Sequence, residues 1–189
     1  MNDKPFLSDI KSLRERARRH ISQGAVTSGY SADRETILKV LNEALATEIV
    51  CMLRYKRHQY MAKGIHAQGV AAEFAAHAAE EQAHADLIAE RIVQLGGDPD
   101  YAPATLLVRS HSEYVEGTDL ADMIEEDLVA ERIAVESYGE FIRYLGSDDP
   151  TTRRLIESIL EKEEEHAEDL ASLLAGLGRK TAELQRASL

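Results

Sequence analysis

The sequence contains no tryptophan, a single cysteine and few aromatic residues, which make up 5% of the chain. Because Cys51 stands alone, we expect no intrachain disulfide, no cysteine-rich zinc site and no iron–sulfur cluster. No apolar run is long enough to cross a bilayer, and the N-terminus lacks the apolar region of a signal peptide. We therefore expect a cytoplasmic protein without a membrane partner.

Positive charge is also scarce, with 22 lysines and arginines against 34 aspartates and glutamates and a net charge of −12. This balance argues against nucleic-acid binding by the body of the protein. It favours attraction of cations, although solubility alone is the simpler explanation. The 189 residues suffice for one domain with a sizeable core, and the abundance of Ala, Leu, Glu and Arg favours helices.

Apolar residues recur at steps of three and four along four long segments, which predicts four amphipathic helices. We expect these helices from Ser31 or Asp33 to about Gly64, from about 68 to 95, from Asp119 to about 145, and from Pro150 to Gly176 or Gly178. Residues 97–117 form one connection long enough to run from one end of a bundle to the other. The sequence thus predicts an all-α fold, a four-helix bundle with a long crossover between its second and third helices.

The first 22 residues reverse the charge balance, with a net +3 against −15 for the rest of the chain. A basic arm of this kind can bind DNA phosphates. Ile10, Leu13, Ala17 and Ile21 also form an apolar edge, so the segment can instead be a short helix docked on the bundle or on a neighbouring subunit. We divide the chain into a basic extension (1–30), the bundle (31–178) and a tail (179–189).

Two Glu-x-x-His motifs, Glu81–His84 and Glu163–His166, each place a carboxylate and an imidazole on one helix face. Glu48 precedes the first motif by 33 residues and Glu131 precedes the second by 32. If each pair of helices folds back at the turn between them, all six side chains lie at one level. Each of them also lies on an apolar stripe, where an unpaired charge is costly.

Four inward glutamates repel one another unless cations neutralise them, and two divalent metals would balance their charge. Mixed oxygen and nitrogen ligands without thiolate suit iron or manganese, while zinc prefers fewer ligands. Taken singly, each motif can arise by chance in a glutamate-rich helix, and each histidine can be a core residue. The joint pattern of six groups predicts a dinuclear metal site formed by Glu48, Glu81, His84, Glu131, Glu163 and His166.

Four further residues lie near this predicted site. Tyr55 and Tyr138 each follow a predicted ligand by seven residues, and they either hydrogen-bond carboxylates of the opposite hairpin or serve as core aromatics. His77, one turn before Glu81, is either an accessory iron ligand or a histidine of the core or of a pore. Asp127, one turn before Glu131, is a candidate to orient a ligating imidazole.

The stretches LNEALATE (41–48), EEQAHAD (80–86), DLVAE (127–131) and EEEH (163–166) resemble the ferritin-like di-iron carboxylate superfamily. The similarity is greatest to bacterioferritin and to bacterioferritin-like members of the Dps (DNA protection during starvation) group. The resemblance implies a ferroxidase centre made by the six residues, with two Fe per subunit. It also implies assembly into a cage that stores oxidised iron. In this interpretation Glu81 and Glu163 bridge the metals, and Glu48 with His84 and Glu131 with His166 complete the two ends.

The sequence departs from bacterioferritin at two points. Gln82 stands where a haem-ligating methionine is expected, so the resemblance implies no haem. Few residues follow the fourth helix, too few for a fifth, which favours a 12-subunit cage over a 24-subunit one. Two other functions remain open: a di-metal redox enzyme without storage, such as a manganese catalase or rubrerythrin-like peroxidase, and a protective DNA-binding protein that uses the basic N-terminus.

Overall fold

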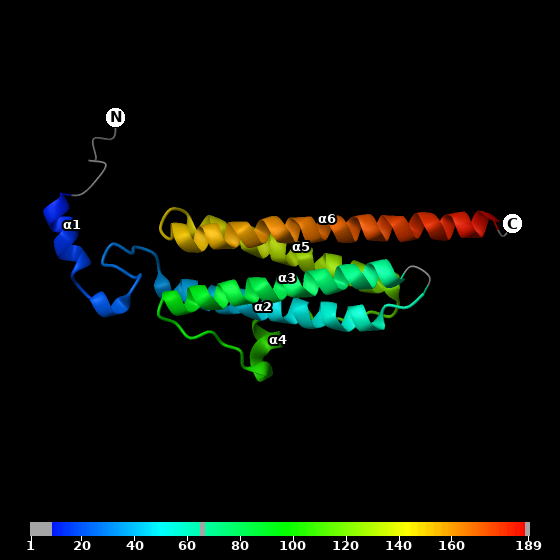
Figure 1. The fold of residues 1–189 in the computed structure, drawn as a ribbon, viewed down its shortest axis with the longest axis horizontal. Coiled ribbons are helices and arrows are strands. Elements are labelled where there is room, and N and C mark those ends of the chain that lie inside the picture. The colour runs from blue at the N-terminus through cyan, green and yellow to red at the C-terminus, as the bar shows by residue number, and fades with distance from the viewer. Residues whose placement is uncertain (1–8, 65–66, 188–189) are drawn as a thin grey trace, which may run out of the picture.

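The computed structural model describes residues 9–64 and 67–187, with side chains up to residue 178. These residues form helices and no strand, which confirms the predicted fold class. The bundle consists of α2 (Arg34–Met61), α3 (Ala67–Gln94), α5 (Leu120–Leu145) and α6 (Pro150–Ala187). Helices α2 and α3 form one hairpin and α5 and α6 the other, and the hairpins meet through α2 with α5 and α3 with α6 (Figure 1).

Three of the long helices begin directly after an aspartate whose side chain caps the first turn. Asp33 accepts a hydrogen bond from the amide of Thr36 (3.3 Å), and Asp119 accepts from the amides of the first turn of α5. Asp149 accepts from the amide of Thr152 (2.9 Å) and directly precedes the proline that opens α6. Each carboxylate satisfies amides that have no partner within the helix, so these starting points follow from local chemistry.

The long crossover lies along α2 and contains η2 (Pro103–Thr105) and α4 (Leu106–Arg109). Arg109 Nη1 donates to the carbonyl of Asn42 (2.9 Å) near the start of α2. Further along, Arg54 Nη1 donates to the carbonyl of Glu113 (2.8 Å), and His58 Nε2 lies 3.1 Å from that of Val115. These contacts span about 24 Å of helix at 1.5 Å per residue, so the connection crosses the bundle as predicted.

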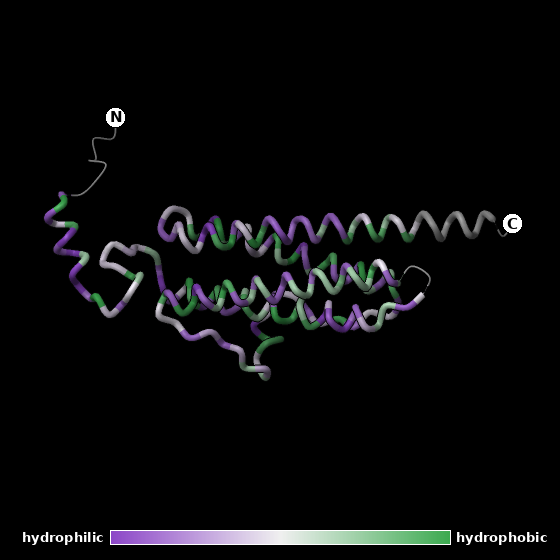
Figure 2. Tube along the Cα trace, viewed as in Figure 1, coloured by the Kyte–Doolittle hydropathy of each residue, from purple (hydrophilic) through white to green (hydrophobic). Residues whose placement is uncertain are grey.

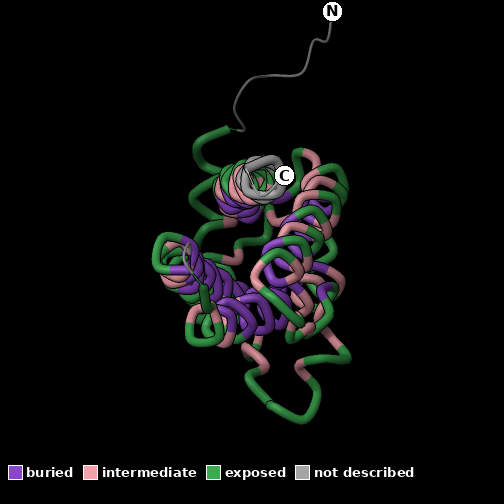
Figure 3. Tube along the Cα trace, turned by 90° about the vertical axis from the view of Figure 1, so that its right-hand side faces the viewer, coloured by how far each residue is buried: buried purple, intermediate pink, exposed green. Residues whose placement is uncertain are grey.

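The buried faces of the four long helices point toward one another (Figure 3). Apolar and polar residues alternate along each helix, as expected for amphipathic packing (Figure 2). One hydrophobic cluster, around Leu41, Ile92 and Leu145, fills the end of the bundle where α6 begins. A second, around Phe74 and Leu170, fills the other end. No helix of the described residues is both long and apolar enough to cross a membrane.

Helix α6 is longer than predicted, because it continues past Gly176 and Gly178 to Ala187. Neither glycine has the positive φ of a helix-ending residue. A glycine inside a helix costs only about 1 kcal/mol, and the residues that follow are mostly good helix formers. The prediction that the helix stops at these glycines is therefore wrong.

The structure of the basic segment also disagrees with one interpretation, that the segment docks on its own bundle. Helix α1 (Ile10–Ala17) and η1 (Ile21–Gln23) form, but α1 buries no side chain and stands away from the bundle (Figure 1). Ile10 is 63% exposed and Ile21 is 82% exposed. Within one chain, the described part of the segment, residues 9–23, therefore does not dock on the bundle.

Candidate metal centre

The six residues singled out from the motifs come together between the two hydrophobic clusters. Glu48 lies on α2, Glu81 and His84 on α3, Glu131 on α5, and Glu163 and His166 on α6. None of them is more than 6% exposed. Their ligand atoms form two sets, each within 4.8 Å: Glu48, Glu81, His84 and Glu163, and Glu81, Glu131, Glu163 and His166. Glu81 and Glu163 belong to both sets.

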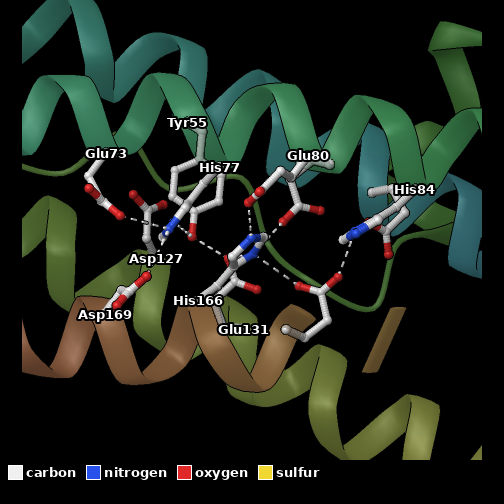
Figure 4. Close-up of polar contacts among 12 residues, drawn as sticks. Tyr55, Glu73, His77, Glu80, His84, Asp127, Glu131, His166 and Asp169 are labelled. Carbon is white, nitrogen blue, oxygen red and sulfur yellow. Dashed lines mark hydrogen bonds and ion pairs between the residues drawn. The ribbon is translucent and has the colours of Figure 1, made fainter. Parts of the chain in front are cut away.

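Each imidazole turns its Nδ1 atom toward these carboxylates (Figure 4). His84 Nδ1 lies 3.0 Å from Glu163 Oε1 and 3.3 Å from Glu48 Oε2. His166 Nδ1 lies 3.3 Å from Glu81 Oε1, 3.5 Å from Glu163 Oε2 and 3.8 Å from Glu131 Oε1. The two ends of the cluster are thus built alike: one end combines Glu48 with His84, and the other combines Glu131 with His166.

Two tyrosines tie the outer glutamates to the opposite hairpin. The hydroxyl of Tyr55 on α2 donates to Glu131 on α5, and the hydroxyl of Tyr138 on α5 donates to Glu48 on α2. Both side chains are at most 1% exposed. The structure therefore has the tyrosine–carboxylate bonds between hairpins that the seven-residue spacing suggested.

Burial and charge shift the proton affinities of the cluster. Burial and the neighbouring Glu163 carboxylate raise the pKa of Glu81 well above its usual range, and the same two causes raise the pKa of Glu131 to about 7. Burial opposes a charge on the imidazoles, but contacts with carboxylates prevail. They raise the pKa of His84 to about 9 and the pKa of His166 to about 11. A metal that binds here must displace protons, so its affinity rises with pH.

The sequence interpretation missed Glu80, which lies on the far side of His166. Its Oε2 atom is 2.6 Å from His166 Nε2. This contact accounts for the Nε2 proton and leaves Nδ1 to face the cluster. Glu80 lies inside the stretch EEQAHAD (80–86), which carries part of the family resemblance. The spacing of residues along α3 does not predict its contact with α6.

Asp127 does not orient an imidazole of the cluster, so that prediction is wrong. Its two oxygens instead lie 2.8 Å from Arg54 Nε and 2.7 Å from His58 Nδ1. The rotation of α5 turns Asp127 toward α2 rather than α6. The resulting group of Arg54, His58 and Asp127 holds the crossover, because Arg54 and His58 also bind its carbonyls.

The profile of the ferritin-like domain matches residues 38–179, three quarters of the chain and all four helices of the cluster. The chain belongs to the ferritin-like family. A bacterioferritin from Desulfovibrio desulfuricans is 30% identical over 156 residues, which cover 80% of this chain and 83% of the relative. The ferritin-like fold therefore accounts for nearly the whole bundle.

Solved structures of related proteins agree with this ferritin-like assignment. A bacterioferritin-related protein from Bacteroides fragilis, described as a dodecameric thioferritin, superimposes with a TM-score of 0.77 at 31% identity. It covers 80% of this chain and 91% of its own. The Desulfovibrio desulfuricans bacterioferritin, whose structure describes a diiron site, gives a TM-score of 0.69 at 27% identity. It covers 79% of this chain and 86% of its own.

The donor atoms of this ferritin-like chain suit a pair of divalent cations. Five buried polar atoms of the cluster have no hydrogen-bond partner among the described residues: Glu81 Oε1, Glu131 Oε2, both carboxylate oxygens of Glu163, and His166 Nδ1. Buried polar atoms normally have such partners, and here the nearest polar groups are the imidazoles and carboxylates of the same cluster. Cations in the two overlapping sets would satisfy these atoms and offset the repulsion among the four carboxylates.

Proposed function

We propose that this ferritin-like chain binds two iron ions in the buried cluster and acts as a ferroxidase that oxidises Fe(II) for storage. The observation that carries the proposal is the pair of overlapping ligand sets that share Glu81 and Glu163. Shared carboxylates suit bridging ligands between two metals. Glu48 with His84 and Glu131 with His166 would complete the two ends, and no thiolate is present, so the donors suit iron or manganese.

Bound iron supplies the electron transfer, in which Fe(II) gives electrons to O₂ or H₂O₂ and becomes Fe(III). The residues of this chain hold the site. Tyr55 and Tyr138 fix the outer carboxylates by hydrogen bonds, and Glu80 fixes His166 through its Nε2 atom. Hydrophobic clusters fill the bundle on both sides of this layer. The net charge of −12 raises the local concentration of Fe(II).

We further propose that the protein assembles into a 12-subunit cage in which the oxidised iron accumulates. The support is its likeness to the Bacteroides fragilis protein, which is described as dodecameric. Large apolar side chains on the bundle surface, such as Val93 (60% exposed) and Tyr144 (53% exposed), suit burial between subunits. Such a cage would limit oxidative damage driven by free iron.

The deciding experiment is an anaerobic Fe(II) titration of metal-free protein, with particle size measured on the same sample. We expect at least two irons per chain to bind anaerobically in a cage, and then loading beyond that number when O₂ or peroxide is added. A small oligomer that saturates at two and loads no more would point instead to a di-metal redox enzyme, such as a manganese catalase or a peroxidase.

A matched variant locates the activity in the cluster. Replacing both histidines, His84→Ala with His166→Ala, removes one nitrogen ligand from each end. We expect fast iron oxidation to be lost while the cage still forms. Oxidation at the wild-type rate in this variant would exclude the cluster as the ferroxidase centre.

A second function, DNA binding by the basic segment, is favoured by the position of α1. Arg14 and Arg16 lie on α1, which buries no side chain, and Arg18 and Arg19 follow directly after it. We expect salt-sensitive retardation of DNA that disappears when residues 1–22 are deleted. Retardation that survives the deletion would place any DNA contact elsewhere.

A further inference from the structure

A second group of ligand-type side chains lies beside the cluster, in the groove between α3 and α6. Glu73 and His77 are one turn apart on α3, and Asp169 is one turn after His166 on α6. His77 Nε2 lies 3.5 Å from Glu73 Oε1 and 3.9 Å from Asp169 Oδ2 (Figure 4). His77 is only 2% exposed, so its Nε2 atom is held in place between the two carboxylates.

The hydrogen bonds around Tyr55 determine which nitrogen of His77 carries the proton. The Tyr55 hydroxyl has one hydrogen, which it donates to Glu131. With Glu131 ionised, the Tyr55 oxygen, 3.2 Å from His77 Nδ1, accepts from that atom. A neutral His77 then presents the lone pair of Nε2 to Glu73 and Asp169. A lone pair facing two carboxylates is repulsive, and a cation bound among them removes the conflict.

The spacing of these atoms fits a metal ion. Bonds of 2.0–2.2 Å to nitrogen and oxygen ligands leave about 3–3.5 Å between neighbouring ligand atoms. The three ligand atoms lie within 4.8 Å of one another, so small side-chain rotations bring them to that range. One imidazole and two carboxylates suit Fe(II), Mn(II) or Zn(II).

The group is open to the outside, unlike the cluster. Glu73 and Asp169 line a cleft of about 420 Å³ between α3 and α6. Small residues, Gly69, Ser172 and Gly176, also line it, and a Cβ atom added at either glycine would meet nothing within 4 Å. At the inner end, the His77 ring stacks on the ring of His166 with 4.1 Å between centroids. Glu73 and Asp169 thus connect the cleft to His77, and the His77 ring connects them to the His166 end of the cluster.

We propose that Glu73, His77 and Asp169 bind a third divalent cation, which in the working protein is Fe(II) on its way from the cleft to the cluster. The delivery role rests on the proposed ferroxidase function, whereas cation binding by the three residues does not. Because His77 contacts both Tyr55 and His166, an ion at this site lies next to the end of the cluster formed by Glu131 and His166.

The test uses crystals of the assembled full-length protein, soaked anaerobically in Fe(II) and examined by anomalous scattering at the iron edge. We expect iron in the cluster and a further peak within bonding distance of His77 Nε2. In solution, the same protein should bind about three Fe(II) per chain at saturation, of which two belong to the bundle site. The double variant Glu73→Gln with Asp169→Asn should lose the third ion and keep the other two.

The control is Glu90→Gln with Glu168→Gln, which removes the same charge from exposed positions on the same two helices. It should keep all three ions. Iron in the cluster with no peak at His77, or a third ion that survives the Glu73 and Asp169 variant, would overturn the third site and leave the proposed function standing. Iron at His77 but none in the cluster would support the third site and overturn the proposed function.

Discussion

Glu80 and His166 face each other across the contact between α3 and α6, with 2.6 Å between the carboxylate Oε2 and the imidazole Nε2. The other nitrogen of His166 faces Glu81, Glu131 and Glu163. Glu80 is therefore a positioning residue for a proposed metal ligand, since it holds the ring so that Nδ1 points inward.

The first prediction is that Glu80→Gln weakens iron binding without removing a ligand. Loss of a carboxylate partner of a ligating histidine typically lowers metal affinity by about 10–100-fold. Because Glu80 is half exposed, we expect about tenfold, confined to one of the two irons. Anaerobic isothermal titration measures this effect. Glu90→Gln, an exposed position on the same helix, is the control, and equal affinities in both variants would refute a positioning role for Glu80.

The second prediction concerns Asp127, which lies between the buried guanidinium of Arg54 and the buried imidazole of His58. In Asp127→Asn the Arg54 guanidinium, only 2% exposed, keeps its charge and loses its carboxylate partner. Breaking a buried ion pair at one partner costs about 3–5 kcal/mol, and we expect a loss of stability of that order. Thermal unfolding of the assembled protein measures it. The exposed Glu125→Gln should unfold at the wild-type temperature, and an unshifted Asp127→Asn would show that the pair contributes little.

The third prediction is a pH dependence at the start of α6. Burial opposes the charge of Asp149, but hydrogen bonds from Thr152 and from the Tyr30 hydroxyl outweigh it and lower the pKa of Asp149 below its usual 3.8. The stability that this carboxylate contributes is therefore complete above the unfolded-state pKa and is lost as the pH falls through the lower folded-state pKa.

Asp149→Asn tests this dependence because asparagine also caps helices, so the variant keeps the cap and loses the charge and one acceptor oxygen. At pH 7 we expect the variant to be about 1–3 kcal/mol less stable, since Arg91 Nη2 loses its charged partner at 2.9 Å. The difference from wild type should shrink as the pH is lowered below about 4. Denaturation curves at several pH values follow it, and a difference that stays constant down to pH 2 would contradict the assignment to Asp149.

The fourth prediction is that the effect of Glu81→Gln on the unfolding temperature changes sign when metal is bound. In metal-free protein, burial and the neighbouring Glu163 carboxylate raise the pKa of Glu81, so at pH 7 the folded state is destabilised relative to the unfolded chain, in which this group is freely ionised. Glu81→Gln removes that cost, and we expect a higher unfolding temperature than in wild type. With Fe(II) present under anaerobic conditions the order should reverse. At a free-ion concentration one hundred times Kd, binding stabilises the wild type by about 2.7 kcal/mol, and the variant lacks a shared ligand. Scanning calorimetry with and without Fe(II) tests both halves. A variant stabilised equally by Fe(II) would exclude Glu81 as a ligand.

Much of this protein follows from its sequence alone, because the signals are local. A helix repeats every 3.6 residues, so the apolar stripes define four helices, and aspartates at their starts define where three of them begin. The same repeat brings Glu48, Glu81, Glu131 and Glu163 to one level once the two hairpins close. It also carries Tyr55 and Tyr138 two turns from the outer glutamates, within reach of the opposite hairpin.

Only the tertiary structure decided which groups pair across helices. Whether Asp127 meets an imidazole of the cluster or His58 depends on the rotation of α5 about its axis, which no spacing along the chain specifies. The contact of Glu80 with His166 and the convergence of Glu73, His77 and Asp169 depend in the same way on the axial offset between α3 and α6. A spacing within one helix determines which side chains share a face, whereas a contact between helices is set by the packing of all four.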